Sequence, residues 1–186
     1  MRKILLFLFS FSFFISVFPQ QKEPTSKKSL DILASAGIQM PIGDFSTTHS
    51  AGVSLDLAPV YHRFRLVNRE SMKFPDGIAF TYNGGFTYYF GKSETVSGYS
   101  YKYPGYLFIH AFGGLFYVPS KKINTSLLAG PAVGIYNGNS KFNIGGRLEA
   151  SYHIGSILHA GPLINWLWEA GTRSLWSAGI KFSVEL

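Results

Sequence analysis

The chain has 186 residues and a formal net charge of +7, with 46% hydrophobic, 17% aromatic and only 15% charged residues. Because an ordinary soluble domain has about 25% charged residues, the low charge indicates an unusual environment, and the length predicts a single domain. The absence of cysteine excludes thiol catalysis, disulfide scaffolding, Cys-based zinc sites and lipidation of an N-terminal cysteine.

The N-terminus has the pattern of a secretory signal peptide. A basic start at Met1–Lys3 precedes fifteen residues, Ile4–Phe18, that contain nothing more polar than serine. This run is shorter than the roughly 20 residues of a membrane-spanning helix, and no later segment approaches that length. We therefore predict a signal peptide over residues 1–20, with an imprecise cleavage site because no small-x-small pair stands before it, and a polar leader over residues 21–29.

From residue 30 onward, hydrophobic residues alternate with polar ones, which is the period of β-strands. We predict eight strands, at residues 30–40, 53–61, 78–90, 105–118, 123–136, 141–154, 157–168 and 175–186. Turn signals separate them, and the strongest is the Asn137-Gly138 pair, which is typical of a two-residue β-hairpin. The strand at 105–118 is apolar on both faces, so the pattern leaves open which face points inward.

The placement of charge predicts which face of the sheet meets lipid. The charged strand residues nearly all fall on the same face as serine, threonine and asparagine; they are Asp31, Asp56, Lys141, Arg147, Glu149, Lys181 and Glu185. A charge on the opposite face would cost about 2–4 kcal/mol at the midplane of a bilayer. We therefore predict an eight-stranded, antiparallel, up-and-down transmembrane β-barrel over residues 30–186. The alternative is a secreted, soluble barrel with its apolar face turned inward to bind a small apolar ligand.

Aromatic residues near the strand ends are typical of the two aromatic girdles of a membrane barrel. With the N-terminus in the periplasm, the predicted outer girdle contains Tyr89, Phe90, Tyr106, Tyr136, Phe142, Trp166, Trp168 and Trp176. The predicted inner girdle contains Tyr61, Phe80, Tyr117, Tyr152 and Phe182.

Two short motifs resemble a known family. The segment Gly37–Phe45 (GIQMPIGDF), with Gly52 after it, resembles the first hairpin of small outer-membrane β-barrel proteins of the Bacteroidetes type. The segment Gly179–Leu186 looks like their terminal barrel-assembly signal, although Leu186 stands where an aromatic residue is common. The resemblance implies an outer-membrane location, insertion by the barrel-assembly machinery and contact with outer-membrane lipid, and implies little about activity.

The interior of an eight-stranded barrel is just wide enough for side chains, which disfavours an open pore. The polar candidates for this interior are Asp56, His62, His110, Arg147, Glu149, Ser151, His153, His159 and Lys181. We predict a structural network of Asp56, Arg147, Glu149, Ser151, His153 and Lys181, because buried charges need partners. Arg147 would pair with Glu149 or Asp56, and Lys181 with Glu149 or Glu185, across neighbouring strands.

We expect no catalytic site, cofactor or metal. The five histidines lack a metal-ligand spacing, and the Gly-Gly pairs are not followed by a helix that would bind phosphate. Ser151 and His153 could instead belong to a lipid-modifying acyl hydrolase, but neighbouring residues on one face of a strand are about 7 Å apart, too far for a relay unless the side chains lean together.

The loop at residues 91–104 is rich in serine and tyrosine, with Tyr99, Tyr101 and Tyr103 in alternate positions. An extended rim hairpin is the expected structure, and capture of an extracellular ligand or surface partner by this loop is a second interpretation. The basic segment at 63–70 would be a solvated periplasmic hairpin. The sequence predicts a structural or surface-interaction role in the outer membrane, without nucleic-acid binding.

Overall fold

The computed structural model describes residues 32–59, 78–120, 122–154, 157–169 and 174–186. The predicted signal peptide, the polar leader, Asp31, Tyr61, His62 and the segment at 63–70 lie outside the described residues.

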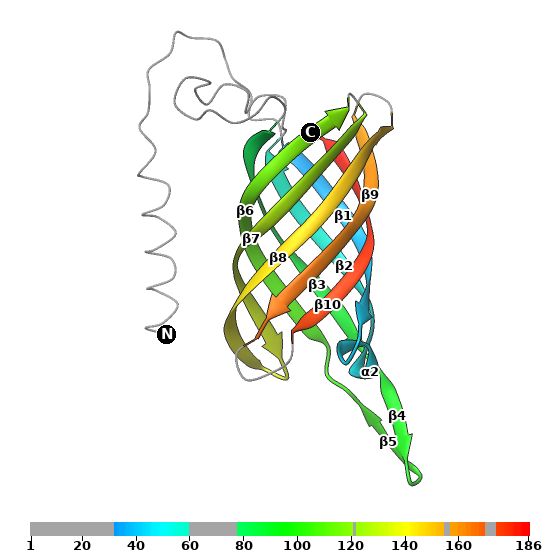
Figure 1. Cartoon of the computed structure of the whole chain (residues 1–186). Coiled ribbons are helices and arrows are strands. Elements are labelled where there is room, and N and C mark those ends of the chain that lie inside the picture. The colour runs from blue at the N-terminus through cyan, green and yellow to red at the C-terminus, as the bar shows by residue number, and fades with distance from the viewer. Residues whose placement is uncertain (1–31, 60–77, 121, 155–156, 170–173) are drawn as a thin grey trace.

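The described chain forms a closed antiparallel barrel (Figure 1), as predicted. Its strands are β1 (Ile32–Ile42), β2 (His49–Pro59), β3 (Ile78–Gly91), β6 (Tyr106–Ser120), β7 (Ile123–Tyr136), β8 (Asn139–Ile154), β9 (Leu158–Trp168) and β10 (Leu175–Glu185). The barrel closes because β1 pairs with β2 on one side and with β10 on the other. The order around the wall is β1-β10-β9-β8-β7-β6-β3-β2.

The two faces of the wall differ as the period of two requires. Along β1, Ser35 and Gln39 are buried in the barrel, whereas Ile38 and Met40 are 63% and 56% exposed on its outside. The same division holds around the wall, where the exposed large apolar side chains include Leu55, Leu57, Phe80, Phe86, Leu127, Ile144, Ile180 and Phe182. An apolar outer face is the arrangement that a bilayer solvates, and it is the reverse of a soluble ligand-binding barrel.

The strand with two apolar faces is β6. Its inward residues are aromatic, and Tyr106, Phe108 and Phe112 are each at most 4% exposed. Glycines make room for them: a β-carbon at Gly134 would overlap the Tyr106 hydroxyl, and one at Gly145 would lie 3.0 Å from Phe112. The bulky inward rings of β6 are therefore accommodated by glycines on β7 and β8.

Two members of the predicted outer girdle are in the interior instead. Tyr89 and Tyr106 are 3% and 4% exposed and point into the barrel, so their assignment to a lipid-facing girdle was wrong. Both have inward positions on their strands. The Tyr89 hydroxyl bonds with Gln39 and Ser177 there, and the Tyr106 ring packs edge-on against Phe45. Trp168 and Phe142, which are 67% and 62% exposed, do face outward.

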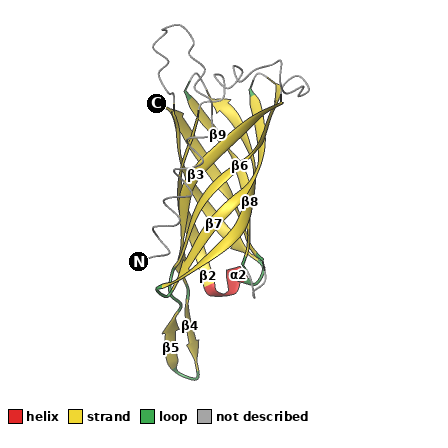
Figure 2. Ribbon diagram, turned by 90° about the vertical axis from the view of Figure 1, so that its left-hand side faces the viewer, coloured by secondary structure: helices red, strands yellow, loops and turns green. Residues whose placement is uncertain are grey.

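The end of the barrel that carries the connections β1–β2, β3–β6 and β7–β8 is called the hairpin end. Asn137 and Gly138 form the predicted tight turn between β7 and β8, with φ values of 48° and 76° that suit a type I′ turn. Between β3 and β6, β4 (Ser93–Val96) and β5 (Tyr99–Lys102) pair into a separate two-stranded sheet. This hairpin extends beyond the barrel (Figures 1 and 2), as the interpretation of residues 91–104 as a rim hairpin predicted.

The connection between β1 and β2 contains a short helix, α2 (Phe45–Thr48), that the sequence did not predict. Gly43 precedes the helix and has a φ of 64°. The Ser46 and Thr47 hydroxyls donate hydrogen bonds to the carbonyls of Gly43 and Asp44. Among the described residues, no helix is long and apolar enough to span a bilayer.

Candidate functional site

A buried cation lies at the centre of the interior. Arg147 of β8 is fully buried, and its Nη1 is 3.1 Å from Asp56 Oδ1 of β2. The same carboxylate oxygen is 3.1 Å from His110 Nε2 of β6. Arg147 Nε also donates a hydrogen bond of 2.6 Å to Asn165 on β9. The guanidinium thus contacts side chains of β2 and β9, and the Asp56 carboxylate extends the network to β6.

A second ion pair joins Lys181 of β10 to Glu149 of β8. Their side chains are 6% and 5% exposed, and Nζ lies 2.5 Å from Oε2. Because β9 stands between β8 and β10, and β2 is not adjacent to β8, both pairs cross the interior. The expectation that the pairs form between neighbouring strands was therefore wrong. In a narrow barrel, inward side chains reach past the neighbouring strand. The residues that pair therefore come from strands that are not adjacent but lie at the same level along the barrel axis.

The other two residues of the predicted network are elsewhere. Ser151 and His153 continue along β8 to the end opposite the hairpin, where both are half-buried. His153 Nε2 is 3.2 Å from Asn124 Nδ2, and its ring centroid is 4.1 Å from that of His159. His159 in turn contacts Glu185, at 3.1 Å, so Glu185 is occupied by a histidine rather than by Lys181.

This histidine cluster does not form a relay or a metal centre in the described residues. No hydrogen bond joins Ser151 to His153 there, since the bond of His153 runs to Asn124. The described residues likewise contain no group of three or more His, Cys, Asp or Glu side chains placed to hold a metal ion. The geometry is that of a polar end of the interior.

Uncharged polar residues that the sequence did not single out complete the network. Gln39 Oε1 accepts a hydrogen bond of 2.5 Å from Asn165, and it lies 2.9 Å from the Tyr89 hydroxyl and 3.0 Å from Ser177 Oγ. Tyr89 is also 2.7 Å from Ser177. Their inward positions were visible in the sequence, but an amide or a hydroxyl gives no signal of its own among many similar residues.

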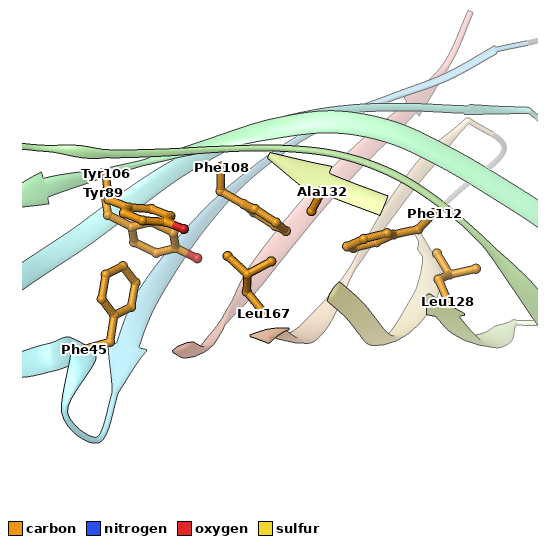
Figure 3. Close-up of a cluster of buried hydrophobic side chains, with 8 residues drawn as sticks. All are labelled: Phe45, Tyr89, Tyr106, Phe108, Phe112, Leu128, Ala132 and Leu167. Atoms are coloured by element: carbon orange, nitrogen blue, oxygen red, sulfur yellow. The ribbon is translucent and has the colours of Figure 1, made fainter. Parts of the chain in front are cut away.

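An apolar cluster extends from the hairpin end to the middle of the interior (Figure 3). Its members are Phe45, Tyr89, Tyr106, Phe108, Phe112, Leu128, Ala132 and Leu167. Helix α2 turns Phe45 inward, with its ring edge-on to Tyr89 at 5.0 Å and to Tyr106 at 5.5 Å. A cavity of only about 10 Å³ remains beside these rings, which is room for one water molecule.

The β4–β5 hairpin presents the most exposed aromatic surface. Tyr99 and Tyr101 are 83% and 54% exposed. Tyr101 contacts Tyr103 edge-on at 4.9 Å, and the Tyr103 hydroxyl donates a hydrogen bond of 2.9 Å to Glu94 Oε2. This bond to a carboxylate raises the pKa of the Tyr103 phenol.

The base of the hairpin is fixed to the barrel end. Lys92 N–H donates to the Thr48 carbonyl at 2.9 Å, and the Lys92 side chain donates to the Ser46 carbonyl at 2.5 Å. Tyr103 N–H closes the base with a bond of 2.9 Å to the Lys92 carbonyl. The hairpin therefore starts from a fixed platform made by α2.

Comparison with known proteins identifies the fold. No family model matches the chain, and no curated protein matches it. Among solved structures it is similar to Ail of Yersinia pestis, alone (8% identity, TM-score 0.53) and in complex with the heparin analogue sucrose octasulfate (7%, 0.52), each over 86% of this chain and 100% of that chain. It is also similar to a de novo designed transmembrane β-barrel (10%, 0.51, over 87% of this chain and 100% of the design) and to the outer membrane enzyme PagL (14%, 0.50, over 83% and 98%). The chain thus has the fold of small membrane β-barrels, and identities this low show the fold alone.

Proposed function

We propose that this protein is an outer-membrane β-barrel of a Gram-negative cell, of the Bacteroidetes type, with a structural or surface-interaction role, no open pore and no catalytic site. It is exported through its signal peptide, inserted by the barrel-assembly machinery and solvated by outer-membrane lipid. The hairpin end faces outward. The motif at Gly37–Phe45 and the outer-membrane barrels of similar fold support this assignment.

The filled interior is the observation that carries the proposal. The side chains of Arg147, Phe112 and Leu128 are each at most 2% exposed. The ion pairs Arg147–Asp56 and Lys181–Glu149 join strands that are not neighbours in the wall. These buried side chains and ion pairs support the proposal that the barrel has no open path for solutes. Among the described residues, the segment that extends beyond the barrel and is open to contact with other molecules is the β4–β5 hairpin (Figure 2).

Location and closure are tested together. Cell fractionation should recover the protein with the outer membrane, and an unboiled sample should migrate differently from a boiled one because a folded barrel resists detergent. Proteoliposomes containing the purified barrel should not swell in small sugars faster than empty liposomes. Recovery in the soluble fraction without a mobility shift would contradict the membrane assignment, and rapid swelling would contradict closure.

Orientation is tested with single cysteines, because the chain has none of its own. S97C lies at the tip of the hairpin, and K122C lies in the turn at the opposite end. A membrane-impermeant maleimide should label S97C on intact cells and K122C only after the outer membrane is permeabilised. The reverse pattern would show that the hairpin faces the periplasm.

Substitution of Ser151 and His153 tests the proposed absence of a catalytic site. PagL is an outer membrane enzyme of similar fold, but in this chain the His153 bond goes to Asn124. Cells that produce S151A/H153A should have the same lipid profile by mass spectrometry as cells that produce the unaltered protein. A lipid product lost in this variant, with folding intact, would make the protein an enzyme.

A further inference from the structure

The tyrosines of the β4–β5 hairpin share one face. Residues two apart on a strand point to the same side, so Tyr99 and Tyr101 share one face of β5. Tyr103 follows the strand and contacts Tyr101, which continues the row to about 14 Å at about 3.4 Å per residue. Glu94 is paired directly opposite Tyr101, which puts its carboxylate on this face as well. We call these four residues the tyrosine face.

Two rings of the row, those of Tyr101 and Tyr103, are held in place by side-chain contacts. The edge contact between Tyr101 and Tyr103 fixes one ring against the next, and the bond from Tyr103 to Glu94 ties the row to the other strand. The turn at the tip has φ values of 51° at Ser97 and 84° at Gly98, as a tight type I′ turn requires. A binding surface whose side chains are held before the ligand arrives loses less entropy on binding.

The chemistry of the face matches a chain of sugar rings. An aromatic ring has a negative face, which attracts the weakly positive C–H groups that cover one side of a pyranose. Tyrosine suits an exposed site because its ring is apolar and its hydroxyl accepts and donates hydrogen bonds. A carboxylate such as Glu94 accepts hydrogen bonds from sugar hydroxyls, and only one of its oxygens, Oε2, is used by Tyr103.

The charges at this end indicate which sugars fit. The described charged residues near the hairpin end are acidic at Asp44, Glu94 and Glu169 and basic at Lys92, Lys102 and Lys141, three against three. The Lys92 ammonium group is bonded to the Ser46 carbonyl, and that of Lys141 lies 3.4 Å from Glu169. A sulfated polymer needs a cluster of cations that are free to meet it, and this surface is balanced.

We infer that the tyrosine face is a binding site for uncharged oligosaccharides, which stack pyranose rings on Tyr99 and Tyr101 and bond a hydroxyl to Glu94, while Tyr103 holds Tyr101 and Glu94 in place. The inference rests on the proposed outward orientation, since it requires the hairpin to meet sugars outside the cell. It differs from recognition of a sulfated ligand such as the one bound to Ail.

The test uses the full barrel in phospholipid nanodiscs and four probes: maltohexaose, N-acetylchitohexaose, mannohexaose and sucrose octasulfate. Binding is measured by calorimetry, and contact with the tyrosines by saturation-transfer NMR. At least one neutral hexasaccharide should bind, with saturation transferred from the tyrosine rings. Failure of all three to bind at 10 mM, or binding of the octasulfate alone, would overturn the inference.

Matched variants locate the site. Y99A/Y101A should weaken binding of the neutral sugar at least tenfold, because both stacking surfaces are removed. Y99F/Y101F keeps the rings and should stay within threefold of the unaltered protein. T95A/S100A changes a cross-strand pair on the other face of the same hairpin and should have no effect. Equal loss in T95A/S100A, or no loss in Y99A/Y101A, would contradict the site.

The cysteine-labelling experiment separates the two proposals. Surface labelling of S97C without sugar binding would refute the oligosaccharide site and leave the surface-exposed barrel standing. Sugar binding in nanodiscs with S97C labelled only from the periplasm would refute the orientation instead.

Discussion

The barrel interior and the β4–β5 hairpin are built from similar residue types under opposite constraints. Tyr89 and Tyr101 are both strand tyrosines, yet the first is 3% exposed and lies against Gln39 and Ser177, whereas the second is 54% exposed. In the interior, register and a narrow diameter decide every neighbour. In the hairpin, only a tight turn and a fixed base constrain the chain. A substitution should therefore act on stability in the first region and on binding in the second.

The largest effect is expected where a buried charge loses its partner. R147M leaves Asp56 without its guanidinium, and we expect it to lower the free energy of unfolding by about 3–5 kcal/mol. The measurement is urea unfolding of the barrel in lipid vesicles.

The double variant D56L/R147M is the control, because it removes both charges. It should unfold at higher urea concentration than R147M alone, since no unpaired carboxylate is left behind. If the two variants unfold together, the stability comes from the bulk of the arginine rather than from the ion pair.

A smaller loss is expected from the aromatic filling of the hairpin end. F45A removes the ring that helix α2 packs against Tyr89 and Tyr106. A phenylalanine deleted from a core costs about 3–5 kcal/mol; here we expect about 2 kcal/mol, because α2 is at the rim and can collapse. Liposome swelling should stay slow in F45A, since the ion pairs below still bridge the interior. Rapid swelling would make Phe45 the seal.

Two Lys–Glu pairs allow the buried and the exposed regions to be compared with the same two residue types. Lys181 and Glu149 are buried, whereas the Lys141 side chain is 54% exposed beside Glu169. K181M should destabilise the barrel by about 3–5 kcal/mol, because it leaves Glu149 buried and unpaired, whereas K141M should cost at most about 1 kcal/mol. Equal costs in urea unfolding would show that burial does not govern these pairs.

The smallest effect on stability is expected in the hairpin. Y99A/Y101A should change the free energy of unfolding by less than about 0.5 kcal/mol, because neither side chain packs on the barrel. The unboiled protein should keep its shifted gel mobility. A large loss of stability would contradict this prediction and would mean that the tyrosines support the wall. Weaker sugar binding by Y99A/Y101A would then reflect unfolding rather than recognition.

The sequence predicts the strands of the barrel wall and which face of most strands points inward, but few of the contacts inside the barrel. Alternation along β8 and β10 predicts which of Arg147, Glu149 and Lys181 face inward, because a period of two needs no partner. It leaves open whether Arg147 meets Asp56 or Glu149, since that depends on how far each strand is staggered around the closed barrel. Pairing across the interior is a property of the closed sheet and is absent from any single strand.

Two further differences have local causes. Tyr89 and Tyr106 were assigned to the outer girdle because aromatic residues near strand ends usually lie there. For Tyr89, the only contrary signal is that it lies two residues from the polar, inward Thr87. Tyr106 has no such signal, because its strand is apolar on both faces. Helix α2 was missed because four residues are too few for a helical period. Its one apolar residue, Phe45, becomes meaningful only when the interior rings are in place.

The bond that closes the base of the hairpin makes the hairpin a separable unit. With Tyr103 N–H bonded to the Lys92 carbonyl, the barrel end has the same geometry whatever lies between these two residues. A hairpin of another length or sequence, grafted between them, leaves the strand register and the interior pairs untouched. On the proposed outward orientation, this separation lets the surface that meets the surroundings vary in evolution while the membrane part of the protein stays constant.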